Sequence, residues 1–316
     1  MIKKKKLLFY APFDYEIDKV IQYYLEQLPE YEITALPQRH FYKNIFEKIA
    51  NFFGKLFLQK KLKNEWVYQK QLKIFNDNLP FDECLIIRPD LIDNRLLKKI
   101  QHEIPKRTTL YWDSFEKIKG FKDTIPYFNQ HFSFEKNDCK QYELQYISNF
   151  YIAKESKKVP EYDAFFFGAF DKRLPIVEKI IQHLSEKKWK VKALLIGGKK
   201  SSSTHQNIER EYIGYPFFES YKFSENTKIV LEINHENQKG LSMRVYEAIG
   251  LKRKIITTNP DIANYEFYNP NNILIINDVN NISILESFLD TPYEDLPIEM
   301  YEKYYIKNWL KTLLNI

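Results

Sequence analysis

Short apolar runs alternate with longer amphipathic segments along the whole chain of 316 residues. The runs have the length of strands that are buried in a parallel sheet, and those at residues 228–233 and 254–258 are also rich in β-branched side chains. In the first half they fall at residues 7–11, 31–36, 83–88, 108–112, 131–134 and 144–147, and in the second half at residues 163–167, 191–196, 212–213, 228–233, 254–258 and 273–276. The segments between them mostly repeat apolar positions every three or four residues, which predicts helices. The pattern therefore predicts an α/β protein with two successive βα arrays.

A polar stretch without periodicity, residues 153–160, separates the two arrays and is typical of a linker. The length suits two domains of roughly 150 residues, so we predict domains at residues 1–152 and 161–316. Only two of the eight glycines precede the linker, which places the positions of close backbone approach in the second domain. Near the end, Tyr301, Tyr305, Trp309 and Leu313 form an i+4 stripe that predicts a closing helix packed back across both domains.

The segment at residues 238–250 links two predicted strands and is punctuated by Gly240 and Gly250. On a helical period it buries a face made by Leu241, Val245, Ala248 and Ile249, while Arg244 and Glu247 share another edge. A helix that starts after a glycine-bearing loop at the carboxyl end of a strand can bind an anion with its unpaired N–H groups. The alternative is that Arg244 and Glu247 form a surface ion pair.

Acidic residues follow three predicted strands of the first domain, at Asp14, Asp90 and Asp113. Ligands of open α/β sheets bind beyond the carboxyl ends of the strands, so these side chains can converge on one cleft. Each of them can instead be a helix N-cap. In the second domain, the strand at residues 163–167 ends at Gly168, and Arg173 follows it. Glycine allows close approach of a phosphate, and arginine can bind it with two hydrogen bonds.

The composition excludes several classes of protein. The formal charge is +6, but no basic stripe or nucleic-acid-binding motif accompanies it, so we predict no nucleic-acid partner. Cys84 and Cys139 form no CxxC motif, which indicates neither a zinc site nor a disulfide framework and fits a reducing cytoplasm. No uncharged apolar run of about 18 residues is present.

Residues 39–75 combine basic and aromatic side chains. They hold nine Lys or Arg against two Glu, interleaved with several phenylalanines, and predict two basic amphipathic helices. Such helices can contact an anionic membrane surface or an anionic acceptor. The alternative is an ordinary aromatic core face with lysines in solvent.

The two arrays, the later glycines and the closing helix together resemble the GT-B class of glycosyltransferases. The segment at residues 228–259 is similar to the donor-binding segment of that class, most of all in bacterial CgeB-like and surface-polysaccharide (lipopolysaccharide or capsule) glycosyltransferases. The resemblance implies two Rossmann-like domains facing a cleft, with Glu247 hydrogen-bonded to the ribose of the donor. Retaining members of the class carry a second glutamate eight residues earlier, where this chain has Lys239.

The resemblance also implies roles for the other residues. Gly168, Arg173, Gly240 and Arg244 would bind the donor diphosphate in residues 161–316, without a metal or other cofactor. Residues 1–152 would hold the acceptor, a glycan or a lipid-linked sugar, and supply a base. Asp14 is the first candidate for that base and Asp113 the second. The expected location is the cytoplasm, with peripheral contact at the inner face of the membrane.

Two alternative functions remain open at this point. A sugar-nucleotide epimerase has a similar architecture but needs an acid/base pair around the sugar. A non-catalytic nucleotide-sugar-binding or assembly protein is compatible with lysine at position 239.

Overall fold

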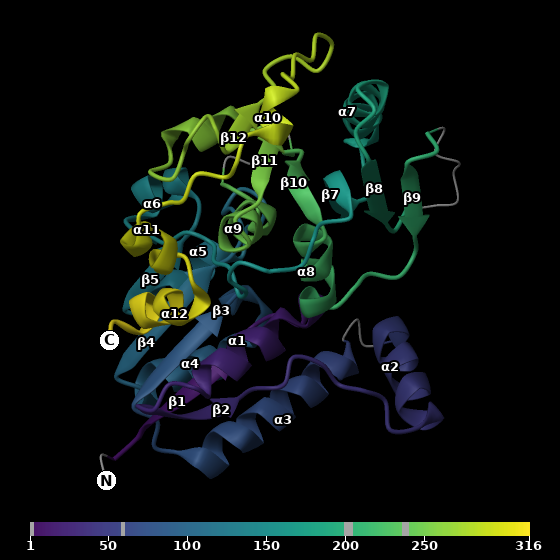
Figure 1. Ribbon diagram of the computed structural model, residues 1–316. Helices are drawn as coiled ribbons and strands as arrows, with labels where there is room; N and C mark the ends of the chain where they lie inside the picture. The colour runs from purple at the N-terminus through teal and green to yellow at the C-terminus, as the bar shows by residue number, and fades with distance from the viewer. Residues whose placement is uncertain (1–2, 58–60, 199–204, 236–239) are drawn as a thin grey trace. The chain divides into compact units, whose positions relative to one another are not determined.

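The computed structural model describes residues 3–57, 61–198, 205–235 and 240–316, apart from the side chains of Asp14, Lys55 and Phe57. The chain divides into two compact units, Met1–Ile147 with Leu310–Ile316, and Ser148–Trp309. Each unit holds a six-stranded parallel sheet (Figure 1). The last helix, α12 (Ile306–Leu314), begins in the second unit, and its residues from Leu310 on are grouped with the first. Residues 153–160, the predicted linker, form neither helix nor strand.

The first sheet has the strand order β2-β1-β3-β4-β5-β6. Its strands are β1 (Lys5–Tyr10), β2 (Tyr31–Ala35), β3 (Glu83–Ile87), β4 (Lys106–Tyr111), β5 (Gln130–Ser133) and β6 (Gln145–Tyr146). The helices of this unit are η1 (Asp14–Glu16), α1 (Ile17–Leu25), α2 (Ile45–Phe57), α3 (Leu62–Asn78), η2 (Pro89–Leu91), α4 (Asn94–Glu103), α5 (Phe121–Thr124), η3 (Ile125–Tyr127) and α6 (Lys136–Tyr142). The chain adds β2 on one side of β1 and β3 on the other, so the order reverses between β1 and β3. Such a reversal opens a ligand crevice at the carboxyl ends of the two strands.

The second sheet has the order β12-β11-β10-β7-β8-β9. Its strands are β7 (Tyr162–Ala169), β8 (Val191–Ile196), β9 (Ile208–Glu211), β10 (Thr227–Glu232), β11 (Lys254–Thr257) and β12 (Ile273–Ile275). The helices are α7 (Leu174–Glu186), α8 (Phe217–Glu225), α9 (Met243–Gly250), η4 (Pro260–Asn264), α10 (Ser287–Asp290) and α11 (Ile298–Lys303). Here the order reverses between β7 and β10, in the arrangement of dinucleotide-binding Rossmann domains.

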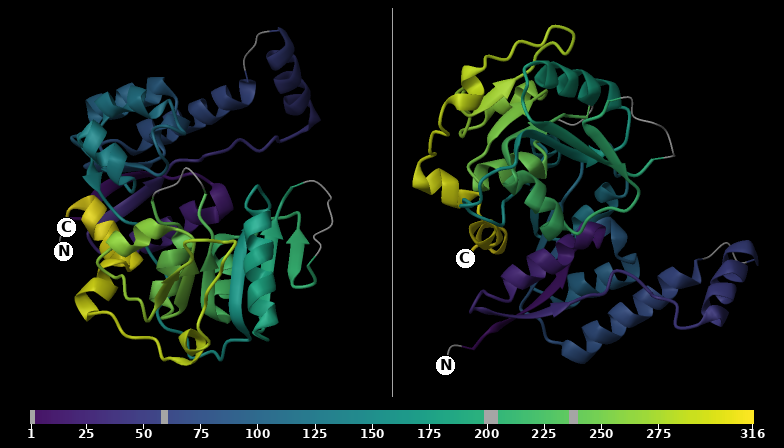
Figure 2. Two further views of the ribbon diagram at one scale, coloured as in Figure 1. Left: turned by 90° about the horizontal axis from the view of Figure 1, so that it is seen from above. Right: turned by 45° about the vertical axis from the view of Figure 1, so that its right-hand side comes forward.

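Alternate residues of β10 serve two separate cores, one on each face of the second sheet. Ile229 and Leu231 pack with α7, while Val230 packs with α9 on the opposite face, because successive side chains of a strand point to opposite sides. The predicted packing face of α9 is confirmed, since Leu241, Val245, Ala248 and Ile249 are all buried. Helices α8 and α9 lie side by side on this face (Figures 1 and 2). Burial on both faces of the sheet explains why Ile229, Val230 and Leu231 of β10 form an uninterrupted apolar run.

Two predicted elements are wrong. The strand expected at residues 212–213 lies at β9 instead, and Tyr212 and Ile213 are exposed beyond its end. The continuous closing helix is divided into α11 and α12, because the backbone of Tyr151 forms a bridge at Tyr305, accepts from the N–H of Ile306 and donates to the carbonyl of Tyr304. These bonds use backbone groups that a continuous helix would need.

Residues 201–204, whose run of serine and threonine predicts a polar loop, lie outside the described residues. Within the described chain, no helix is both long enough and apolar enough to cross a membrane.

Candidate functional site

A small cavity of about 160 Å³ lies where the second sheet reverses its strand order. It is lined by the ends of β7 and β10, the residues that follow them and the start of α9: Phe166, Phe167, Arg173, Leu231, Glu232, Ile233, Asn234, His235, Ser242 and Arg244. The cavity therefore occupies the position at which open α/β sheets bind their ligands. Two of the predicted donor-binding residues, Arg173 and Arg244, meet there.

Arg173 is held rigidly at this cavity. Its Nε and Nη2 donate to the carboxylate of Asp171 at 2.9–3.0 Å, and its Nη1 donates to the carbonyl of Ile233 at 2.7 Å. Burial alone would raise the pKa of Asp171, but hydrogen bonds and charge from Arg173 outweigh it and hold that pKa below its usual value. The guanidinium thus ties the loop after β7 to the end of β10 at the edge of the cavity.

Gly168 is the position in β7 where a side chain does not fit. A Cβ atom there would lie 2.8 Å from the ring of Phe166 and 3.5 Å from Nη2 of Arg173. Phe166 is buried and lines the cavity, so its ring could make room for a Cβ only by shifting against its neighbours or into the cavity. The glycine is explained by close packing beneath the cavity.

The start of α9 presents donors to the same cavity. Gly240 is the first described residue after positions 236–239. Lys239, which stands where retaining members of the class carry a glutamate, therefore lies outside the described residues. Ser242 is the N-cap residue, yet its side chain makes no capping hydrogen bond. Its hydroxyl is buried near Glu232, but in the described chain it has no partner at hydrogen-bonding geometry. Among the described residues, no side chain therefore caps the first-turn N–H groups of α9, and uncapped N–H groups at a helix start can bind an anion.

Arg244 and Glu247 form the ion pair that their spacing predicts, but it does not lie on the surface. The side chain of Arg244 is 19% exposed, whereas that of Glu247 is 0% exposed. Arg244 lies over the ring of Phe167, with its guanidinium 4.5 Å from the ring centroid. Glu247 Oε2 accepts from Arg244 and from the Ser224 hydroxyl, the latter at 2.7 Å, while Oε1 is buried without a partner in the described chain. Arg244 thus faces the cavity, and Glu247 lies behind it.

Glu232 is a cavity residue that sequence reasoning missed. Burial raises its pKa, and a hydrogen bond from the Thr257 hydroxyl only partly offsets that effect. The signal for it was present, because Glu232 is an acidic residue at the carboxyl end of a buried strand. The same criterion had selected the aspartates of the first domain.

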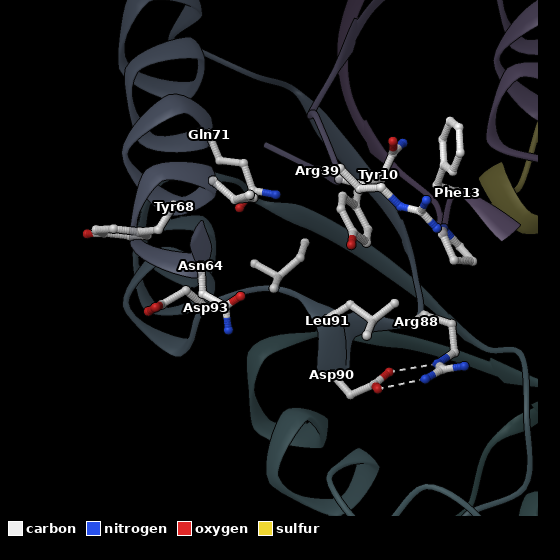
Figure 3. A pocket seen from close by; sticks show the side chains of 14 residues that line it. Tyr10, Phe13, Arg39, Asn64, Tyr68, Gln71, Arg88, Asp90, Leu91 and Asp93 are labelled. Atoms are coloured by element: carbon white, nitrogen blue, oxygen red, sulfur yellow. Dashed lines mark hydrogen bonds and ion pairs between the residues drawn. The ribbon is translucent and has the colours of Figure 1, made fainter. Parts of the chain in front are cut away.

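A larger cavity, of about 560 Å³, lies where the first sheet reverses its order. Figure 3 shows that it is bounded by α3 on one side and by the segments after β1, β2 and β3 on the others. Its lining residues are Tyr10, Pro12, Phe13, Gln38, Arg39, Asn64, Val67, Tyr68, Gln71, Arg88, Asp90, Leu91, Ile92 and Asp93. The guanidinium of Arg39 lies over the ring of Phe13, 4.2 Å from its centroid. Aromatic faces and amide side chains in one cavity of this volume suit a small polar ligand.

Arg88 links two of the predicted acidic residues. It donates to both carboxylate oxygens of Asp90 at 2.9 Å, and its Nη1 lies 3.8 Å from Asp113 Oδ2 (Figure 3 shows the bonds to Asp90). Arg88 has a left-handed backbone, with φ of 62°, at the end of β3, a conformation that costs energy for a non-glycine residue. Asp113 also pairs with Lys117 at 2.8 Å and does not line the cavity.

The predicted base Asp14 begins η1, directly beyond the end of β1, but its side chain lies outside the described residues. Tyr15 and Glu16, which follow it, both have left-handed backbones, with φ of 52° and 60°. Consecutive strained residues at the carboxyl end of a strand are a feature of functional loops. Asp90 therefore borders the 560 Å³ cavity, and Asp113 is linked to Asp90 through Arg88. Asp14 follows β1, a strand that lines the same cavity.

Comparisons with solved structures identify the fold. An alpha-glucosyltransferase in complex with UDP and a 13-mer DNA aligns over 98% of this chain and 94% of its own, with a TM-score of 0.53 and 12% identity. The pneumococcal O-GlcNAc transferase GtfA, in complex with UDP and GlcNAc, aligns over 78% of this chain and 60% of its own, with a TM-score of 0.50 and 11% identity. These likenesses show that the chain has the two-domain GT-B fold, as predicted.

A UDP-N-acetylglucosamine 2-epimerase also aligns, over 82% of this chain and 80% of its own, but its TM-score of 0.45, at 11% identity, is too low to support an argument. No protein-family model matches the chain, and no curated protein does.

Proposed function

We propose that this protein is a glycosyltransferase that moves a sugar from a nucleotide-sugar donor to a glycan or lipid-linked acceptor in the synthesis of bacterial surface polysaccharide or a related glycoconjugate. The observation that carries the proposal is the cavity at the reversal point of the second sheet, where Arg173, Arg244 and the uncapped start of α9 meet. The GT-B fold, which it shares with two transferases whose structures contain UDP, supports it.

The donor diphosphate would bind in the 160 Å³ cavity. Pockets for whole drug-sized ligands measure about 300–1,000 Å³, so this cavity has the size for part of the donor. N–H groups at the start of α9 and the guanidinium of Arg244 would stabilise the negative charge that develops on the leaving diphosphate. We propose that these N–H groups take the place of a divalent metal.

The donor ribose would be held by Glu247. A carboxylate can accept hydrogen bonds from both hydroxyls of a vicinal diol, and Oε1 has no partner in the described chain. That oxygen is buried behind Arg244, so a ribose can reach it only when the side chain of Arg244 turns toward the diphosphate. Donor binding and the break of the Arg244–Glu247 contact would therefore occur together.

The acceptor would bind in the 560 Å³ cavity of the first unit, whose volume suits a sugar. Inversion at the sugar carbon requires a base that removes the proton from the acceptor hydroxyl as the diphosphate leaves on the opposite side. Asp14 is our first candidate, because it follows β1 within a strained loop beside this cavity. Asp113 is the second, because it pairs with Lys117 and Arg88 and does not line the cavity.

The test is thermal denaturation with a panel of nucleotide sugars, the corresponding nucleoside diphosphates and free sugars. A donor at 100 times its dissociation constant adds about 2.7 kcal/mol to the stability of the unit that binds it. We expect one nucleotide family to raise the melting temperature and free sugars to have no effect. A panel in which no nucleotide sugar stabilises the protein would contradict the proposal.

Product analysis with the stabilising donor then separates the alternatives. Release of the nucleoside diphosphate with transfer to an added acceptor is the expected result, and the acceptor panel should include lipid-linked sugars, oligosaccharides and a DNA oligomer, since one structural neighbour contains DNA. An isomerised sugar nucleotide formed without acceptor would identify an epimerase. A bound donor with no turnover across the panel would identify a binding protein.

A further inference from the structure

Helix α2 (Ile45–Phe57) turns its apolar face to solvent and its polar face to the protein. The exposed fractions of its large apolar side chains are 63% for Ile45, 75% for Phe46, 45% for Ile49, 61% for Phe52, 49% for Phe53 and 61% for Leu56. They recur at the spacing of one helix face. Asn51, at 3%, is buried in their place. This is the reverse of the usual arrangement in a water-soluble domain.

Specific hydrogen bonds fix this orientation. Asn51 Oδ1 accepts from the backbone N–H of Lys63 at 3.0 Å, and its Nδ2 donates to the hydroxyl of Tyr42 at 2.8 Å. Glu47 accepts from the backbone N–H of Lys43 at 2.9 Å and contacts His40 Nε2 at 2.7 Å. Rotating α2 to bury its phenylalanines would break these contacts, so the exposure of the apolar face is built into the fold.

The neighbouring helix shows that the core does not require α2. Helix α3 (Leu62–Asn78) buries Tyr68 and Phe75 against the first sheet, while α2 lies beyond the N-terminal end of α3, away from the sheet (Figures 1 and 2). The alternative that the aromatic residues of these helices form an ordinary core face therefore holds for α3 and is wrong for α2. The six exposed apolar side chains of α2, which we call the α2 apolar face, are not part of that core.

The charge around the α2 apolar face indicates its partner. Residues 39–63 contain seven Lys or Arg and one Glu, and Lys43 and Lys48, which lie next to the apolar positions in the sequence, are exposed. Apolar side chains flanked by cations suit an anionic membrane surface, where the rings enter the acyl boundary and the cations meet phosphate groups. A second copy of the chain would bring like charges together. At 13 residues, α2 is about 20 Å long, too short to span a bilayer and suited to lie in its interface.

We propose that α2 attaches the protein to anionic membranes by inserting the α2 apolar face into the interface. This inference goes beyond the proposed function and does not depend on it, because the attachment needs neither donor nor acceptor. It would bring the first unit, whose cavity is lined in part by α3, to a surface that carries lipid-linked substrates.

The test is co-sedimentation of the full chain with vesicles. We compare vesicles of phosphatidylglycerol and phosphatidylcholine in equal parts with vesicles of phosphatidylcholine alone, at low and at high salt. We expect binding to the anionic vesicles that weakens with salt, because surface charges are screened. Absence of binding to anionic vesicles at low salt would overturn the proposal.

Two sets of variants separate the apolar from the charged contribution. The double variant Phe46→Ser/Phe52→Ser should lower the partition coefficient by at least about tenfold, since burying one phenylalanine is worth at least one such factor. Lys48→Gln should lower it about fivefold, which corresponds to about 1 kcal/mol for one cation at the surface. Ile213→Ser is the matched control, because Ile213 is 80% exposed in the second unit, and it should have no effect.

All four substituted side chains are exposed, so the melting temperature should not fall, and Lys48→Gln leaves every apolar residue in place. Equal losses for Ile213→Ser and the double variant would contradict a role of α2. Sedimentation velocity without lipid gives a further outcome: a dimer that Phe46→Ser/Phe52→Ser dissolves would show that a second copy covers the α2 apolar face, and would also overturn the proposal.

Discussion

Replacing Arg244 by alanine should destabilise the second unit strongly, because it leaves a buried carboxylate without its charged partner. Glu247 is fully buried, and after Arg244→Ala the Ser224 hydroxyl, at 2.7 Å, is the one partner that its carboxylate keeps among the described residues. Breaking a buried ion pair from one side costs about 3–5 kcal/mol. Because 19% of the Arg244 side chain is exposed, water can partly replace it, and we expect about 3 kcal/mol.

The double variant Arg244→Ala/Glu247→Gln tests the cause of that loss. Glutamine keeps an oxygen for the Ser224 hydroxyl and carries no charge, so the remaining cost should be about 1 kcal/mol, the worth of an ordinary hydrogen bond. The double variant should then be about 2 kcal/mol more stable than Arg244→Ala. Lys190→Ala, which removes an exposed ion pair with Glu161 in the same unit, is the control and should leave the unfolding midpoint unchanged.

Urea unfolding followed by hydrogen exchange in peptides from β10 and β11 reports on the second unit alone. With a urea dependence of about 1–3 kcal/mol per molar, the midpoint for Arg244→Ala should fall by ~1–3 M. A loss below about 1 kcal/mol, or a double variant no more stable than Arg244→Ala, would refute the reasoning. The pair would then be one whose charges are solvated in the folded protein.

Two further predictions concern binding and turnover. Gly168→Ala should weaken donor binding while the protein stays folded, because the new Cβ would displace the Phe166 ring at the cavity. Calorimetric titration with the stabilising nucleotide sugar measures the dissociation constant, and an unchanged value would contradict the prediction. Asp14→Asn should abolish transfer and leave donor affinity nearly unchanged, since it removes a base and no donor contact; Asp113→Asn, tested in parallel, should retain activity, and loss of transfer in that variant alone would make Asp113 the base.

The pattern of apolar runs was sufficient to predict the fold class and most strands. Strands β3, β8 and β10 lie within about one residue of their predicted limits, because strands buried on both faces consist mostly of apolar residues in an almost continuous run. The spacing of Arg244 and Glu247 likewise predicted their pairing. It did not predict the burial of that pair, because burial depends on α8, which supplies Ser224 from a distant part of the chain.

The orientation of α2 could not be read from its sequence. An amphipathic period states that one face is apolar, but the period is the same whether that face meets a core or a membrane. Only the tertiary structure shows that α3 fills the core and that Asn51 anchors α2 with its apolar face outward. In the same way, Asp90 and Asp113 were predicted to lie at strand ends, but their joint contact with Arg88 follows from the strand order.

Local pattern thus determined the elements of this protein, the pairing of neighbours on one helix and the presence of acids at strand ends. Those features depend on residues a few positions apart, whose geometry the helix or strand itself sets. The tertiary structure decided which strands are adjacent, where the two cavities lie, and that Glu232 and Ser242 meet at one of them. These features depend on contacts between segments far apart in the chain, and no period in the sequence encodes which segments will meet.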